Sequence, residues 1–193
     1  MGYALMNLLW YPTSLLEILS AIYFFLPAGF ANMAPPVIGK FFTLPGSPID
    51  NGKKWKGKEI FGSHKTWRGF ISAIVVGVFI FNVQIILYQF SIFKSLSVLD
   101  YSKASFWIGF LLSFGAIFGD LIKSFFKRRL AIQSGKSWIP FDQIDYVVGA
   151  LLCTAIVFIP PVSTILTILI FFPLIHPLVN TIGYHMRIRD VKV

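Results

Sequence analysis

Long apolar runs separated by short polar segments dominate this chain. Five of them have the length and composition of membrane-spanning segments: Leu15–Ala34, Gly69–Phe90, Ser105–Phe126, Tyr146–Ile159 and Val162–Ile182. A helix needs about 20 mostly apolar residues to cross the roughly 30 Å hydrocarbon core of a bilayer, and the fourth run is the shortest. Unbroken apolar runs lack the alternation of barrel strands, so the pattern predicts helices. We therefore expect an all-α integral membrane protein with about five transmembrane helices, built as a single domain over residues 1–193.

The composition agrees with this prediction. Hydrophobic residues make up 56% of the chain, which is above the range of soluble domains. The formal net charge of +9 comes from basic residues beside the apolar runs, without the motifs of a nucleic-acid-binding fold. Membrane lipids and phosphate-bearing ligands are therefore the expected partners, and nucleic acid is not.

The basic residues also predict the orientation in the membrane. Of the 17 Lys and Arg residues, only Lys94 and Lys103 fall on one side of the five predicted spans. Cytoplasmic segments carry the excess of Lys and Arg, so we expect the N-terminus outside and the C-terminus inside. Two polar cytoplasmic loops follow from this arrangement, at residues 40–68 and 123–145. The basic residues on the cytoplasmic side are Lys40, Lys53, Lys54, Lys56, Lys58, Lys65, Arg68, Lys123, Lys127, Arg128, Arg129, Lys136, Arg187, Arg189 and Lys192.

Proline and glycine residues predict where the helices end. Pro35 and Pro36 are expected to end the first span, because proline lacks an amide proton and restricts the preceding residue. Gly135 is expected to end the helix that continues from the third span, and Pro140 to lie near the start of the next helix.

One acidic residue lies inside the third predicted span. Asp120 stands deep in an apolar run, where a carboxylate costs about 2.5 to 3.5 kcal/mol on insertion scales and normally faces the interior of a bundle. Lys123, Ser124 and Lys127 follow on the same helical face, with Arg128 at its edge. This face suits a metal ion deep in the membrane and phosphate groups nearer the surface. The alternative is that Asp120 pairs with a neighbouring lysine for packing alone.

A second acidic pair, Asp142 and Asp145, follows Pro140. On a helix that begins there, both carboxylates lie on one side, at about the depth of Asp120 on the neighbouring helix. Three carboxylates at one point repel each other unless a cation neutralises them, and Mg²⁺ prefers oxygen ligands together with substrate phosphates. The spacing therefore predicts a metal site. Asp142 could instead be the N-cap of its helix.

The segment that precedes the second span contributes a third group of candidates. Residues 62–69, Gly-Ser-His-Lys-Thr-Trp-Arg-Gly, place Lys65 and Arg68 beside the free amides of a helix N-terminus, which suits an anionic phosphate. Ser63 is expected to cap this helix. Basic residues at the cytoplasmic end of a span are also expected for topology alone. For His176, between two prolines of the last span, a hydrogen-bonding role within the bundle is favoured.

These residues resemble the signature of a known family. Gly119-Asp120-Leu121 with Ser124, Lys127 and Arg128, then Pro140 and Asp142-Gln143-Ile144-Asp145, look like the motif of integral membrane CTP-dependent phosphatidate cytidylyltransferases. Residues 63–69 look like the shorter second motif of that family. The compact chain and the string over residues 135–145 resemble the archaeal branch. The resemblance covers most of the chain in length and span order, and its specific motifs lie within residues 62–69 and 119–145.

The chain departs from the bacterial members in two ways. They are longer, and they carry a Lys-Asp pair and a glycine-histidine-glycine-glycine run where this chain has Gln133-Ser134 and residues 138–141, Trp-Ile-Pro-Phe. The shorter form favours an ether-lipid substrate and argues against a histidine-dependent step.

The resemblance implies a nucleotidyltransferase of phospholipid biosynthesis in the cell membrane, with its active site on the cytoplasmic side. CTP and unsaturated archaetidic acid (2,3-di-O-geranylgeranylglyceryl phosphate) would give CDP-archaeol and pyrophosphate, with Mg²⁺ as cofactor. Asp120, Asp145 and Lys127 would be catalytic, and Asp120, Asp142 and Asp145 would hold one or two metal ions. The substrate-binding residues would be Ser63, Lys65, Arg68, Lys123, Ser124 and Arg128.

Other functions stay open at this point. A CDP-diacylglycerol synthase would carry out the same reaction on ester phosphatidic acid. A small membrane transporter could use Asp120 in a relay, and a structural membrane protein would need no clustered acids. A CDP-alcohol phosphotransferase would also use membrane aspartates and Mg²⁺, but its D-G-x-x-A-R signature is absent.

Overall fold

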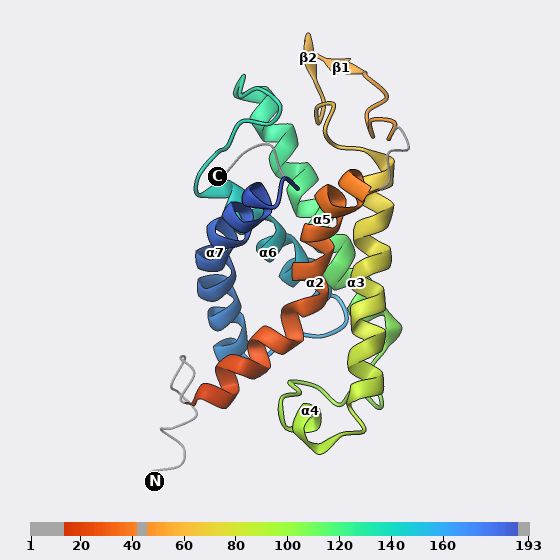
Figure 1. Cartoon of the computed structure of the whole chain (residues 1–193), viewed down its shortest axis with the longest axis vertical. Coiled ribbons are helices and arrows are strands. Elements are labelled where there is room, and N and C mark those ends of the chain that lie inside the picture. The colour runs from red at the N-terminus through yellow and green to blue at the C-terminus, as the bar shows by residue number, and fades with distance from the viewer. Residues whose placement is uncertain (1–13, 42–45, 189–193) are drawn as a thin grey trace.

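The structure is a computed structural model that describes residues 14–41 and 46–188. Within these residues the helices are α2 (Leu15–Phe41), α3 (Trp67–Leu87), α4 (Ser91–Ser95), α5 (Phe106–Arg129), α6 (Phe141–Thr154) and α7 (Val162–His185). A two-stranded antiparallel hairpin, β1 (Lys54–Trp55) and β2 (Lys58–Glu59), lies between α2 and α3. Figure 1 shows the long helices as a bundle, with the hairpin at one end and α4 at the other. The bundle agrees with the predicted helical class, whereas the hairpin was not predicted.

In the described part of the chain, four helices, α2, α3, α5 and α7, are long and apolar enough to cross a membrane. They coincide with four of the five predicted spans. The remaining prediction, Tyr146–Ile159, corresponds to α6, which begins at Phe141, ends at Thr154 and has 14 residues. A helix of that length extends about 21 Å, less than the thickness of the hydrocarbon core. Residues 155–161 complete the path to α7, and the two prolines at 160 and 161 disfavour helix there.

The ends of the bundle differ in charge. The C-terminal ends of α2, α5 and α7 lie at the hairpin end, whereas the segment that carries Lys94 and Lys103 lies at the α4 end (Figure 1). The predicted division of basic residues is thus present along the bundle axis for the described residues, while Arg189 and Lys192 lie outside them. Which end faces the cytoplasm stays a prediction.

Pro35 and Pro36 do not end the first helix, so that prediction was wrong. α2 continues to Phe41 with Pro27, Pro35 and Pro36 inside it. A proline leaves the carbonyl four residues earlier without its helical donor, but a neighbouring membrane helix can supply another. The carbonyl of Tyr23, four residues before Pro27, accepts a hydrogen bond from the Gln84 side chain on α3.

The predicted end of the third helix was also wrong. α5 ends at Arg129, and Gly135 lies in the loop beyond it with φ +83°. Ala131 takes the left-handed conformation (φ +60°), and the amide of Ile132 donates to the Lys127 carbonyl at 3.0 Å, which closes the helix end. Alanine seldom adopts this conformation, so the sequence carried no signal for the stop.

One capping prediction was wrong, and the capping alternative for Asp142 is not found. Thr66, not Ser63, caps α3, because its hydroxyl oxygen accepts from the Gly69 amide at 3.2 Å. Asp142 does not cap α6, since Pro140 occupies the N-cap position.

Helices α5 and α6 pack more closely than ordinary side chains permit. A methyl group on Gly115 would lie 2.8 Å from the Cα atom of Ala150, and one on Gly149 would lie 2.8 Å from the Cα atom of Gly119. Small residues four positions apart let membrane helices approach in this way. This contact fixes the position of Asp120, the one acidic residue of α5, relative to the acidic residues of α6.

Candidate active site

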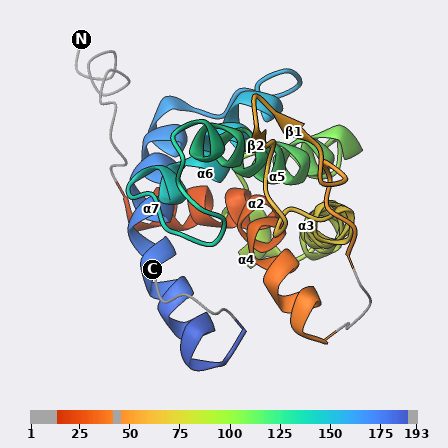
Figure 2. The ribbon, with the colours of Figure 1, turned by 90° about the horizontal axis from the view of Figure 1, so that it is seen from above.

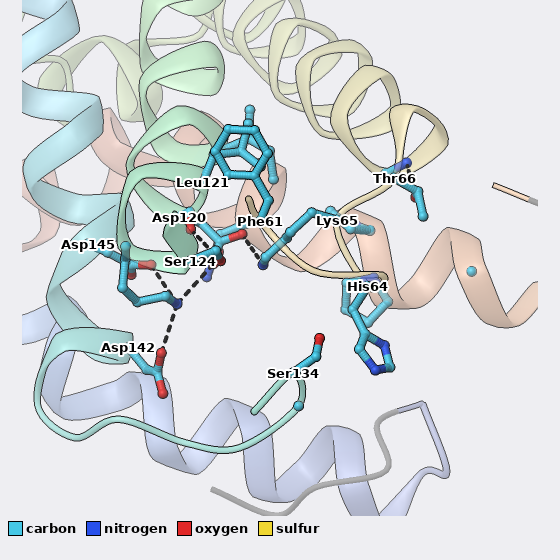
Figure 3. Close-up of a pocket in the computed structure, with 18 of the residues that line it drawn as sticks. Phe61, His64, Lys65, Thr66, Asp120, Leu121, Ser124, Ser134, Asp142 and Asp145 are labelled. Atoms are coloured by element: carbon cyan, nitrogen blue, oxygen red, sulfur yellow. Dashed lines mark hydrogen bonds and ion pairs between the residues drawn. The ribbon is translucent and has the colours of Figure 1, made fainter. Parts of the chain in front are cut away.

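A cavity of about 1180 Å³ lies toward the hairpin end of the bundle. Residues of α5 and α6, the loop segments 61–66 and 134–137, and the C-terminal halves of α2 and α7 line it. Figure 3 shows the three predicted carboxylates on one side of this cavity, with Lys65 reaching toward them from the loop before α3.

Three carboxylates from α5 and α6 surround one ammonium group. The Nζ atom of Lys123 lies 2.9 Å from Asp120 Oδ1, 2.8 Å from Asp142 Oδ1 and 2.8 Å from Asp145 Oδ2. Asp120 is 9% exposed. The structure therefore brings together the three acids as their spacing predicted. It also places Lys123 among them, where the prediction had only a metal ion.

Two further lysines extend this charge cluster. Lys65, from the loop before α3, forms an ion pair with the second oxygen of Asp120. Lys127 lies 3.2 Å from Asp142 Oδ1 and donates to the Lys136 carbonyl. Three ammonium groups thus balance three carboxylates within the cavity wall.

The described residues hold no group of three or more His, Cys, Asp or Glu side chains in a ready-made metal arrangement. The three acids approach a common point, and Lys123 occupies it. An ammonium group at that point marks a position where oxygens from two helices can reach a cation.

The loop that carries Lys65 is held by backbone pairing on both sides. The Ile49 amide donates to the Lys65 carbonyl at 2.8 Å, and the Trp67 amide donates to the Ser47 carbonyl at 3.0 Å. Asp50, which the sequence did not mark as functional, organises the same loop. Its carboxylate accepts the amides of Gly52, Phe61 and Gly62 at 3.0, 3.0 and 3.3 Å. Partial burial acts to raise the pKa of Asp50, but these three amides outweigh it and lower the pKa below its usual value.

The hairpin in this loop docks on the end of α5. Arg129 Nη1 donates to the Trp55 carbonyl at 2.7 Å, and Lys58 Nζ donates to the Arg129 carbonyl at 2.9 Å. The Trp55 ring stacks on Phe125, with ring centroids 5.3 Å apart. These contacts tie the loop to the helix that carries Asp120.

Arg128 is buried with part of its hydrogen-bonding capacity unused. Its side chain is 7% exposed, and its Nε and Nη1 atoms have no hydrogen-bond partner among the described residues. Because a buried guanidinium normally donates several hydrogen bonds, this arrangement fits an anionic ligand in the cavity. Arg68 and the exposed Ser63 also line the cavity. The Ser124 hydroxyl, which is predicted to bind substrate, donates to the Asp120 carbonyl of its own helix at 2.8 Å.

The sequence interpretation missed part of the lining. Asn32 of α2 and Asn180 of α7 face the cavity, as does His176, which was expected only to bond within the bundle. Asparagine inside an apolar span was a usable signal, because polar side chains at membrane depth usually have partners or functions. These residues were missed because the prediction rested mainly on charged side chains.

A bundle of membrane-spanning helices around a cavity lined by clustered acids and bases defines an integral membrane protein with a charged cavity. Residues 14–193 match the family described as CarS-like, CDP-archaeol synthase. The chain is similar to the CDP-archaeol synthase of Pyrococcus furiosus, with 40% identity over 175 residues that cover 90% of this chain and 97% of that protein. It is also similar to the CDP-archaeol synthase of Methanocaldococcus jannaschii, with 38% identity and coverage of 89% and 95%.

A solved structure has a similar fold. It is described as an intramembrane enzyme for archaeal membrane lipid biosynthesis, and it matches with a TM-score of 0.65 and 28% identity over 84% of this chain and 94% of that chain. The chain belongs to the CDP-archaeol synthase family. The resemblance to the archaeal branch seen in the motifs is thereby confirmed.

Proposed function

We propose that this protein transfers the cytidylyl group of CTP to unsaturated archaetidic acid, giving CDP-archaeol and pyrophosphate. An oxygen of the lipid phosphate attacks the α-phosphorus of CTP, and the bond from that phosphorus to the pyrophosphate oxygen breaks. One observation carries the proposal: α5, α6 and the loop before α3 bring three carboxylates and their lysine partners together in one cavity. The chain that forms this cavity belongs to the CDP-archaeol synthase family.

The protein's part in this reaction is to position two anions and neutralise their charge. The lipid phosphate is already an anionic nucleophile, so no covalent intermediate with the protein is needed. The three carboxylates and three lysines of the cluster balance one another. Arg128 lies outside this cluster. Glu59 acts on it electrostatically, but its Nε and Nη1 groups remain open to donate to incoming phosphates. Lys127 and Lys65 are placed to shift from carboxylates to phosphate oxygens.

The residues present fit a magnesium ion. Oxygens of Asp120, Asp142 and Asp145 reach a common cation at Lys123, and carboxylate oxygens are the ligands that Mg²⁺ prefers. Lys123 would have to withdraw from this point for the ion to bind. When bound there, the ion would supply positive charge that stabilises the negative charge developing on the leaving pyrophosphate.

We propose that the site lies on the cytoplasmic side of the cell membrane, because CTP is made in the cytoplasm. The basic residues gathered at the hairpin end support this orientation through the excess of Lys and Arg in cytoplasmic segments.

The proposal is tested by assaying the purified chain with CTP, Mg²⁺ and a panel of lipid phosphates at fixed surface concentration in one detergent. Pyrophosphate release and CDP-lipid formation should both depend on the lipid phosphate. We expect kcat/KM for unsaturated archaetidic acid to exceed that for a matched diacyl phosphatidic acid by at least about tenfold, roughly 1.4 kcal/mol in the transition state. A ratio at or below one would assign the chain as a CDP-diacylglycerol synthase. Absence of turnover with every lipid would reject the enzyme assignment and leave transport as the class to test.

A further inference from the structure

One wall of the cavity takes no part in the charge cluster. It belongs to the C-terminal halves of α2 and α7, which reach the same end of the bundle and lie on the same side of it (Figures 1 and 2). We call this surface the helix wall, and we call the loop segments 61–66 and 134–137 the loop wall. The helix wall consists of Asn32, Pro35, Pro36, Gly39, His176 and Asn180, with Lys40 at its edge.

The helix wall lies between two contacts that join α2 to α7. On one side of it, the rings of Phe25 and Phe172 pack edge to face with centroids 4.6 Å apart. On the other side, Lys40 Nζ donates to the Met186 carbonyl at 2.7 Å. Between them, the two helices present polar side chains to the cavity at membrane depth.

Two residues of this wall are buried side by side, and one of them, Asn180, has unused hydrogen-bonding capacity. His176 and Asn180 are each 8% exposed, and the Asn180 amide lies 3.4 Å from His176 Nδ1. Asn180 Oδ1 has no partner among the described residues. A flip of the amide exchanges its two ends, so that the Nδ2 group becomes the open donor while Oδ1 accepts from a protonated His176 Nδ1. A buried amide with an open position on a cavity points to a ligand that fills it.

The chemical properties of the two substrates indicate which of them binds at the helix wall. CTP arrives from water and meets the loop wall first, whereas the lipid phosphate stays in the bilayer and can approach only between helices. Its phosphate and ether oxygens accept hydrogen bonds, which an amide or an imidazole N–H can donate. We infer that the helix wall binds the glycerol phosphate portion of the lipid substrate, with Asn180 as a specificity-determining donor and His176 beside it. This inference rests on the proposed function and assigns the two substrates to different walls.

Occupancy can be tested without turnover. On a Cys153→Ser background, Asn32→Cys reports on the helix wall and Ser134→Cys on the loop wall. A small water-soluble thiol reagent should label Asn32→Cys several-fold more slowly when ether lipid phosphate is present, but not when CTP and Mg²⁺ are present. Ser134→Cys should show the reverse. Protection of Asn32→Cys by CTP, or no protection by the lipid, would overturn the inference even if the enzyme proves active.

Kinetics give the second test. Asn180→Leu should raise the KM for the lipid phosphate by about tenfold, as expected for one lost hydrogen bond to a charged group, with the Kd for CTP unchanged. Thr181→Val is the matched control, since Thr181 bonds to the Pro177 carbonyl of its own helix and does not line the cavity. If Asn180→Leu fails to fold, His176→Phe, which keeps a ring against Tyr146, takes its place. A rise in the CTP Kd with unchanged lipid KM would place the nucleotide on the helix wall instead.

Discussion

Gly119 of α5 packs against the backbone carbonyl of Asp145 on α6 so closely that a methyl group on Gly119 would collide with that oxygen. Asp120 is the next residue on α5, and both carboxylates reach the Lys123 ammonium. The separation of the two acids is therefore set by a backbone contact between helices, and not only by their side chains.

Replacement of Gly119 by alanine should push α5 and α6 apart at the charge cluster. We expect a loss of about 1–3 kcal/mol in stability from overpacking and a fall in kcat/KM on the order of 10²-fold from displaced acids. Thermal unfolding and cytidylyl transfer measure the two effects. Gly29→Ala is the matched control, because the added methyl group would meet only the Phe172 ring at an ordinary 3.4 Å. Equal activity of Gly119→Ala and Gly29→Ala would contradict this role for the contact.

Conversion of the proposed metal ligands to amides should abolish the reaction without unfolding the protein. Asp120→Asn and Asp145→Asn each remove one anionic oxygen donor from the point where the acids meet. Cytidylyl transfer across a Mg²⁺ titration, with size-exclusion profiles as the folding check, measures the effect. Glu17→Gln, near the opposite end of α2, should keep most activity. Robust turnover by Asp145→Asn in Mg²⁺ would show that Asp145 is not a required metal ligand.

Lys123 offers a test of the metal site that needs no activity. Lys123→Met leaves three carboxylates without their shared partner, so in EDTA the variant should lose about 3–5 kcal/mol of stability, as when one partner of a buried ion pair is removed. Mg²⁺ should restore much of the lost stability, because in the variant it can bind the three carboxylates without competition from the Lys123 ammonium group. The unfolding temperature with EDTA and with Mg²⁺ measures both effects. Lys103→Met, whose parent side chain is 85% exposed, should show neither. A Lys123→Met protein that is destabilised equally with and without Mg²⁺ would argue against a metal at this point.

Much of the site was predictable because its chemistry repeats at helical spacing. Asp120, Lys123 and Lys127 share one face of α5, and a deep carboxylate in an apolar run has few structural uses. The position of Lys123 at the centre of the acids was not predictable. Helical periodicity shows on which face of a helix a residue lies, but not which groups the end of a long, flexible side chain contacts. The continuation of α2 through Pro35 and Pro36 was missed because neighbouring helices can compensate a proline in a membrane bundle, and that compensation is tertiary. The order of the loop around Asp50 depends in the same way on amides up to twelve residues away.

The orientation in the membrane gives the last prediction. The segment with α4 and the segment after α5 lie at opposite ends of the bundle, and the basic residues gather at the latter end (Figure 1). Because cytoplasmic segments carry the excess of Lys and Arg, residue 133 should face the cytoplasm and residue 95 the exterior. On a Cys153→Ser background, Ser95→Cys and Gln133→Cys place one exposed thiol at each end. An impermeant maleimide applied to intact cells should label only Ser95→Cys, and permeabilised cells should give labelling of both. Labelling of both positions in intact cells would contradict a chain that places these segments on opposite faces. Labelling of Gln133→Cys alone would invert the orientation and move the proposed CTP site to the exterior.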